Sequence, residues 1–401
     1  MKRITLLSLA LGFFLCGKCQ EAPCLSDQLH NELLNTPSYR ADYQELESMV
    51  QSVFPPTGIL TVPIVVHIMH HGEDEGVGYN ITEAQVLSAV AALNEDFSNF
   101  EPLGGVDTEI QFCLASRDPN GNPTNGINRV DATVIENYLE EGIAAGSENF
   151  GGANEIAVKS LSIWPRTDYY NIWVVSEIRN SNNCSGIQGY AYFPTSSASV
   201  DGTVMDDGAF GTEGTVCNSL SDGSILSHEV GHGLFLYHVF EGGCTEDNCE
   251  TQGDLICDTA PSWVTYGCTT TSCDGTGEME NYLGYTSCKH IFTQLQKDRM
   301  RNTLSTYRSS LLASDGCTPS NLCLGDLNGD LVVDIIDFIQ FNSAYGTSCT
   351  GCIEDLNGDG QVNSEDFLIL NSNYGNLCVG GAVSQPIDYE PINVDFLGRQ
   401  R

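Results

Sequence analysis

The chain has 401 residues, which is longer than one ordinary domain, so more than one folded unit is expected. Its 53 acidic and 16 basic residues give a formal net charge of −37, which repels phosphate backbones and anionic membranes, so we expect no nucleic-acid partner. The 17 cysteines suit an oxidising compartment, where disulfides support loop-rich structure.

Residues 1–19 have the layout of a secretory signal. A basic start, Met1-Lys2-Arg3, precedes an apolar run over residues 4–16. The run is too short to cross a bilayer and no later run is long enough, so we expect a secreted protein without a transmembrane segment. A lipid anchor on Cys16 or Cys19 is the alternative, but the residues before Cys16 fit a lipoprotein signal poorly.

Residues 20–57 are polar and weakly helical, and they end in Pro55-Pro56-Thr57-Gly58, which is typical of a linker. The main domain is therefore expected over residues 58–316. Its strand candidates are the segments 59–69, 109–115 and 170–178, and its helix candidates are a segment capped by Thr82 and Gln85, one around 153–163 and one over 292–304. Strands and helices alternate, which favours an α/β sandwich.

The segment 227–238, SHEVGHGLFLYH, carries the strongest chemical signal. On a helix, His228 and His232 lie about 40° apart around the axis, so both imidazoles reach one ion. Glu229 lies beside them, where a carboxylate can act as general base toward water that a zinc ion activates. His238 can be the third ligand only if the helix stops after His232, and Gly233, which tolerates a left-handed conformation, is the expected breaker.

A bare pair of histidines at this spacing is common by chance on a helix face. The third histidine, the strand-rich segment before the motif and the cysteine-rich segment after it favour a zinc site. From Gly242 to Cys288 the periodicity disappears, and disulfides must hold this part together.

Beyond Cys317 two copies of one pattern, 325–346 and 354–375, stand 29 residues apart. They indicate a small helical domain over residues 317–378 with calcium loops, because side-chain oxygens stand at positions 1, 3, 5, 9 and 12 of each copy. These residues are Asp326, Asn328, Asp330, Asp334 and Asp337, then Asp355, Asn357, Asp359, Asn363 and Asp366. Each loop precedes a single apolar helix, so the pair resembles a dockerin module. Cys323, Cys349, Cys352 and Cys378 follow the same offset and are expected to close one bridge per repeat.

The chain resembles the pappalysin family of metzincin metalloproteases over roughly residues 20–305. The resemblance rests on several ordered motifs besides the histidine motif. They are CLASRDPNGNPTNGINRV (113–130), YYNIWVV (169–175), GYAYFP (189–194), DGTVM followed by FGT (201–212), GDLICDTAP (253–261), and NYLGYTSC followed by FTQLQKDRM (281–300).

The resemblance implies a secreted metalloendopeptidase that cleaves internal peptide bonds of proteins and uses one catalytic zinc. Its fold would be a metzincin-like α/β (α+β) domain with a twisted mixed sheet, an active-site helix and a disulfide-rich irregular lower subdomain. Residues 20–57 would be a pro-segment, in which Cys24 can bind the zinc as a latency switch. A disulfide partner or an unused thiol is the alternative for Cys24.

Further site residues are implied only by the resemblance. Tyr285 would stabilise the oxyanion, and Asp254 with Thr259 would bind a structural calcium. One bridge would end at Cys273 and a second would join Cys268 to Cys288. An ordinary core tyrosine and a solvated loop aspartate are the simpler alternatives.

Three departures from the family pattern stand near the site. Leu283 replaces the usual methionine below the metal, where it can pack similarly. Phe235 stands where the family prefers glycine. The acidic pair expected between Thr286 and Cys288 is missing, so the preference for a basic residue after the scissile bond should not be carried over.

Two other functions are compatible with the sequence: an inactive calcium-dependent adhesion or scaffold protein, and a zinc-dependent amidase on non-protein substrates. Glu229 argues against the first, because a structural zinc site needs no base. The repeats could bind a cohesin-like partner or stiffen a stalk. The tail 379–401 faintly resembles a sorting signal, which would indicate a Gram-negative bacterial source.

Overall fold

The computed structural model describes residues 22–376 except 100–103, 147–150, 180–183, 185, 246–247, 269–272, 274–277, 319–323, 329, 331, 349–351 and 358. The expected signal and the expected tail therefore lie outside the described residues. The helices are α1 (Ser26–Leu33), α2 (Pro37–Ser52), α3 (Glu83–Ser98), α4 (Tyr138–Glu141), α5 (Glu155–Ser160), α6 (Ser224–Gly233), α7 (Gln294–Thr306), α8 (Ser309–Leu312), α9 (Ile335–Ala344) and α10 (Ser364–Asn373). The strands are β1 (Leu60–His70), β2 (Ile110–Leu114), β3 (Ile127–Asp131), β4 (Tyr170–Val175), β5 (Gly189–Ala191) and β6 (Thr203–Asp206).

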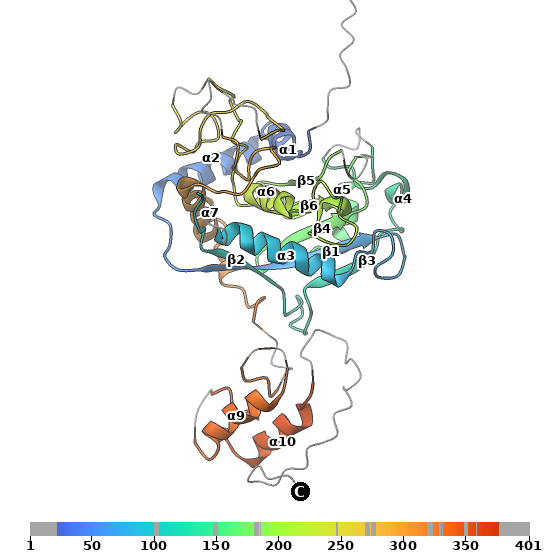
Figure 1. The fold of residues 1–401 in the computed structure, drawn as a ribbon, viewed down its shortest axis with the longest axis vertical. Coiled ribbons are helices and arrows are strands. Elements are labelled where there is room, and N and C mark those ends of the chain that lie inside the picture. Colours follow the sequence, from blue (N-terminus) through green and yellow to red (C-terminus); the bar gives the residue numbers. More distant parts are fainter. Residues whose placement is uncertain are drawn as a thin grey trace, which may run out of the picture.

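A mixed sheet of six strands forms the centre of the fold (Figure 1). The long strand β1 pairs in parallel with β2 along its first half, with β3 along its second half, and with β4 on its other side. Strand β6 continues the parallel order on β4, and β5 pairs with β6 as an antiparallel edge strand. Eight consecutive residues of β1 are buried, as expected for a parallel strand covered on both faces.

Helices α3 and α6 cover one face of the sheet, and α1 and α5 pack against residues of the other. On the first face, Val90 and Phe97 of α3 share a core with Leu226 and Val230 of α6. On the second face, Leu29 of α1 and other apolar residues pack around Trp173 of β4. The predicted mixed α/β architecture is confirmed, and the Thr82 cap of α3 forms as expected, since its side chain accepts a hydrogen bond from the amide of Gln85.

The N-terminal segment is helical and packs on the main domain. Leu46 and Val50 of α2 share a core with Phe235. Glu47 forms a bidentate ion pair with the buried guanidinium of Arg299 on α7, at 2.5 and 2.7 Å. The strong helicity of this segment was not expected from its polar sequence, and it depends on these tertiary contacts.

Residues of the two C-terminal repeats form a small core of their own. Val333 and Phe341 from the first repeat pack with Val362 and Leu370 from the second. Each of α9 and α10 begins with a capping box, made by Asp334 with Asp337 and by the equivalent residues of the second copy. Among the described residues, no helix is long and apolar enough to cross a membrane.

Candidate metal centre and active site

Helix α6 carries the first two histidines of the motif, and all ten of its residues are buried. Asp222 precedes the helix and accepts hydrogen bonds from the amide and the hydroxyl of Ser224, which satisfies an amide of the first turn. The helical spacing places the Nε2 atoms of His228 and His232 3.2 Å apart. His228 and His232 therefore share one face of a helix, as predicted, and the packing of α6 on the sheet and on α3 holds that face in its orientation.

The chain turns sharply after α6, but not by the predicted mechanism. Gly233 ends the helix without a left-handed conformation; Phe235 has that conformation instead, with φ of +76°. Gly233 is needed for a different reason, because a Cβ there would lie 1.7 Å from the Tyr170 hydroxyl. A left-handed phenylalanine costs about 1–2 kcal/mol. Buried packing and the Arg299 guanidinium, 4.3 Å from its ring centroid, offset this cost.

The turn returns His238 to the first two histidines. Its Nε2 lies 3.1 Å from that of His228 and 3.2 Å from that of His232. The three Nδ1 atoms face acceptors: the carbonyl of Tyr282 at 2.7 Å, the carbonyl of Leu236 at 2.8 Å and a carboxylate oxygen of Asp27 at 2.5 Å.

These acceptors fix the tautomers, because each Nδ1 must carry the proton. Three Nε2 lone pairs then face one another at 3.1–3.2 Å, which is repulsive unless a cation lies between them. Ligand nitrogens around a tetrahedral zinc are about 3.3 Å apart, given Zn–N bonds of about 2.0–2.1 Å. The donor set therefore fits a zinc ion.

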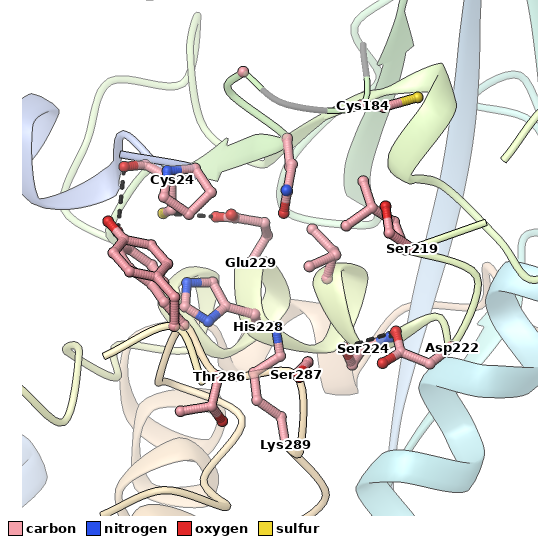
Figure 2. A pocket seen from close by; sticks show the side chains of 17 residues that line it. Cys24, Cys184, Ser219, Asp222, Ser224, His228, Glu229, Thr286, Ser287 and Lys289 are labelled. Atoms are coloured by element: carbon pink, nitrogen blue, oxygen red, sulfur yellow. Dashed lines mark hydrogen bonds between the residues drawn. The ribbon is translucent and has the colours of Figure 1, made fainter. Parts of the chain in front are cut away.

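Glu229 lies on the next position of α6 and is buried beside this centre. Burial raises its pKa to about 8, against hydrogen bonds from Cys24 and Ser26 that lower it. The Cys24 thiol lies 3.3 Å from one of its carboxylate oxygens (Figure 2). The Ser26 hydroxyl lies 3.3 Å from the same oxygen. A buried carboxyl group with a raised pKa is suited to exchange protons near neutral pH.

The N-terminal segment occupies this site directly. The Cys24 sulfur and one nitrogen of each of the three histidines all lie within 4.8 Å of one another. Cys24 forms a parallel bridge with Gly189 of β5, and the carbonyl of Pro23 accepts a 2.7 Å hydrogen bond from Gln188. Residues 23 and 24 thus lie along the edge strand of the sheet.

Tyr285 lies on the other side of the centre. Its ring centroid is 5.7 Å from that of His228 and 4.9 Å from that of His238. Burial raises the pKa of its hydroxyl well above the usual value, so the group is a donor at neutral pH. It donates a 3.5 Å hydrogen bond to the backbone carbonyl of Cys24. Leu283 is buried below α6, close enough that a Cβ on Gly231 would lie 3.1 Å from its side chain.

Asp254 and Thr259 are brought together, but by a hydrogen bond to each other. The Thr259 hydroxyl lies 3.0 and 2.8 Å from the two carboxylate oxygens of Asp254. The bridge expected to end at Cys273 is formed with Cys244, and a further bridge joins Cys249 to Cys257.

The expected bridge between Cys268 and Cys288 is not formed in the structure. Both thiols are free, and they interact by a side-chain hydrogen bond that lowers the pKa of Cys268. Cys268 is exposed while Cys288 is partly buried, where burial raises the pKa of its thiol. The resemblance thus identified the right neighbours, but the sulfurs are in hydrogen-bond contact instead of covalently joined.

In the C-terminal repeats, carboxylate oxygens of Asp326, Asp330 and Asp337 lie within 4.8 Å of one another. Asp337 is buried and accepts hydrogen bonds from the amides of Leu327, Asn328 and Asp334. The second loop is arranged similarly, since buried Asp366 accepts from the amides of Asn357 and Asn363, and Asp355 accepts from those of Asp359 and Gly360. Of the four cysteines of the repeats, Cys352 is disulfide-bonded and the other three lie outside the described residues.

Sequence reasoning missed three residues around the centre. Asp27, three positions after Cys24, binds Nδ1 of His238; burial would raise its pKa, but the facing histidine lowers it to about 2. Asp96 of α3 accepts hydrogen bonds from Ser227 at 2.5 Å and Tyr282 at 2.7 Å, which ties α6 to the turn that holds His228. Lys289 points toward α6 from the loop after Tyr285 (Figure 2). No local pattern marks Asp27 or Asp96, because their partners are distant in sequence.

Proteins built in this way are metal-dependent peptidases of the metzincin class. A family model of peptidase M43, described as pregnancy-associated plasma protein-A, matches residues 153–305. An extracellular metalloprotease of the fungus Colletotrichum graminicola is 31% identical over 265 residues, which cover 62% of this chain and 78% of the relative. An extracellular metalloprotease of Pyricularia oryzae is 30% identical over 262 residues, which cover 62% of this chain and 77% of the relative.

Two solved structures are similar as well. A mutant of promirolysin from Tannerella forsythia superposes with a TM-score of 0.58 and 27% identity, covering 73% of this chain and 97% of that one. Mirolysin in complex with a compound superposes with a TM-score of 0.53 and 30% identity, covering 66% of this chain and 100% of that one. This chain therefore belongs to the pappalysin-type M43 family and is a secreted metalloendopeptidase. The curated relatives named above are fungal, so they do not support the expected Gram-negative source.

Proposed function

We propose that the chain is a zinc-dependent endopeptidase, made as a latent precursor, in which His228, His232 and His238 bind the metal. The convergence of three Nε2 lone pairs at 3.1–3.2 Å carries this proposal. When bound, zinc supplies a Lewis acid that acidifies water and polarises the scissile carbonyl. Chelation should abolish peptide cleavage and zinc should restore it, whereas cleavage that survives chelation contradicts the proposal.

Glu229 would serve as the general base. Its buried carboxyl group is adjacent to His228 and close to the point where the three imidazoles meet, so it can take a proton from the attacking water and give one to the leaving amine. A scaffold protein has no use for such a carboxylate.

Tyr285 would donate a hydrogen bond to the substrate carbonyl as negative charge develops on its oxygen. The contact with the carbonyl of Cys24 supports this role, because the hydroxyl already donates to a peptide carbonyl at the site. Protein or peptide substrates would lie along the edge strand β5, where residues 23 and 24 lie in the structure.

The pro-segment would extend over residues 20–57 after a signal at 1–19, with the peptidase domain over 58–316. Cys24 would be the latency switch, since a divalent cation deprotonates a coordinating thiol and the thiolate would exclude water. Cys24→Ala should give a precursor that hydrolyses peptides before any processing. A precursor variant as inactive as the wild type would contradict the switch.

The repeats at 317–378 would bind structural calcium. The convergent carboxylates of Asp326, Asp330 and Asp337 support this proposal. The second copy supports it too, because it has oxygen-bearing side chains at the same positions of its loop. Exposed Ile335, Ile336 and Ile339 on α9 favour a partner-binding role, such as docking on a cohesin-like protein, over a stalk. Calorimetric calcium titration of the chain should lose one site in Asp326→Ala, and unchanged stoichiometry would contradict the assignment. Asp254 and Thr259 remain a proposed further calcium site.

A further inference from the structure

A pocket opens beside the metal centre, between the first half of α6 and the loop that follows Tyr285. Its volume is about 280 Å³. Leu220 and Ile225 give it apolar walls, Glu229 also lines it from α6, and Ser287 and Lys289 line it from the loop. It is large enough to receive one side chain of a substrate.

The position of Glu229 decides which substrate side chain enters. In the proposed function, on which this inference depends, Glu229 protonates the leaving nitrogen and so must lie on the side of that nitrogen. The pocket opens on the same side, because Glu229 itself lines it. It therefore receives the side chain of the residue directly after the scissile bond.

Lys289 is the cation of this pocket. Figure 2 shows its side chain extending from the loop toward α6, with Asp222 farther along the same wall. Asp222 is engaged with the first turn of α6, where it accepts the bonds from Ser224. Within the described residues, the Lys289 ammonium has no ion pair or hydrogen bond.

A partly buried ammonium without a bonded partner is costly, and an arriving carboxylate would relieve that cost. A substrate lysine or arginine would instead bring a second cation beside Lys289. We propose that Lys289 makes this peptidase prefer substrates with aspartate or glutamate directly after the scissile bond. An acidic pair in this loop would instead give a preference for basic residues, which carry the opposite charge.

The test uses the full chain after removal of its pro-segment and three peptides that differ only in the residue after the scissile bond: Glu, Gln or Lys. Each peptide continues for three more residues and ends in an amide, so no terminal carboxylate can replace the side chain. We expect kcat/KM for the Glu peptide to exceed that for the Lys peptide by about tenfold or more. Equal values for the two peptides would overturn the inference.

Three substitutions locate the effect. Lys289→Arg should keep the acidic preference, Lys289→Gln should remove it, and Lys289→Glu should reverse it in favour of the Lys peptide. If Lys289→Gln lowers kcat/KM equally for all three peptides, the lysine acts on Glu229 and not on the substrate, and the inference is wrong. Loss of acidic preference in Lys289→Arg, with the fold intact by circular dichroism, would also contradict it.

The same measurements distinguish failure of this inference from failure of the proposed function. A wild type that cleaves the Gln peptide only when zinc is present, but does not discriminate between Glu and Lys, leaves the peptidase mechanism intact and refutes the role of Lys289. A wild type that cleaves none of the three peptides, nor a mixed peptide library, refutes the mechanism itself.

Discussion

Two segments meet at the metal centre and are held in place differently. Helix α6 is buried against the sheet and against α3 beside it, and its position follows from apolar packing. In the segment 241–291, the described residues form turns and bends, and the bridges Cys244–Cys273 and Cys249–Cys257 constrain it. In the proposed function the first segment supplies two metal ligands and the base, whereas the second supplies Tyr285 and Lys289. Packing therefore fixes the proposed reaction centre, whereas a crosslinked loop shapes the surroundings that are proposed to select substrates.

Tyr285→Phe tests whether the loop also contributes to the chemistry. If its hydroxyl donates to the developing oxyanion, kcat should fall about 100-fold with KM nearly unchanged, because one donor to the transition state is lost. Steady-state kinetics on one peptide would measure both constants. If the tyrosine is purely structural, the variant should keep the wild-type kcat. The loop would then contribute nothing to the chemistry, which would depend on the first segment alone.

Gly233→Ala tests the packed segment. The new Cβ would lie 1.7 Å from the Tyr170 hydroxyl, so the end of α6 or strand β4 must shift, at a cost of about 1–3 kcal/mol in unfolding free energy. Urea unfolding measures this loss. Gly231→Ala is the matched control, since its Cβ would meet the movable ends of two leucine side chains, Leu283 at 3.1 Å and Leu236 at 3.7 Å. Equal losses in the two variants would show that the turn is not packed as described.

Cys249→Ser with Cys257→Ser tests the crosslinked segment. Loss of this short bridge should lower the unfolding free energy by about 2.5 kcal/mol while the zinc content stays unchanged. Unfolding curves and metal analysis of the same sample check both parts. Loss of zinc in this variant would mean that the metal centre depends on the loop.

Asp96→Asn tests the contact that joins the two segments. The stability that Asp96 contributes should depend on pH. Burial raises the pKa of Asp96 to about 6, against the hydrogen bonds from Ser227 and Tyr282. Folding therefore favours its protonated form, so its stabilising contribution is full below about pH 4 and is lost as pH rises through 6. The melting temperature of the wild type relative to Asp96→Asn should fall by a few degrees between pH 4 and pH 7. A constant difference across that range would contradict the raised pKa.

The sequence predicted the parts of this molecule that depend on local pattern. The main strands, the capped α3 and the pair His228 and His232 follow from periodicity and spacing. The turn after α6 was expected, but its left-handed residue was placed at Gly233 instead of Phe235, because the obstacle at Gly233 is Tyr170, which is distant in sequence.

Contacts between distant residues were beyond the reach of sequence patterns. The strands β5 and β6 are too short to show a clear period, and the helices of the N-terminal segment are stabilised by ion pairs such as that of Glu47 with Arg299. The bond of Asp27 to His238 joins residues 211 positions apart. Lys289 could have been noticed, since it stands directly after the place where the expected acidic pair is missing.

We propose that three imidazoles hold one zinc ion and that Glu229 supplies the base. Glu229→Gln keeps the size and polarity of this side chain but removes its basicity, so comparison with the wild type separates binding from chemistry. Both proteins, freed of the proposed pro-segment, would be analysed for metal content and for hydrolysis of one peptide. We expect one zinc per chain in both, with hydrolysis reduced at least about 1,000-fold in Glu229→Gln. Undiminished hydrolysis by that variant, or a wild type that hydrolyses the peptide without bound zinc, would contradict it.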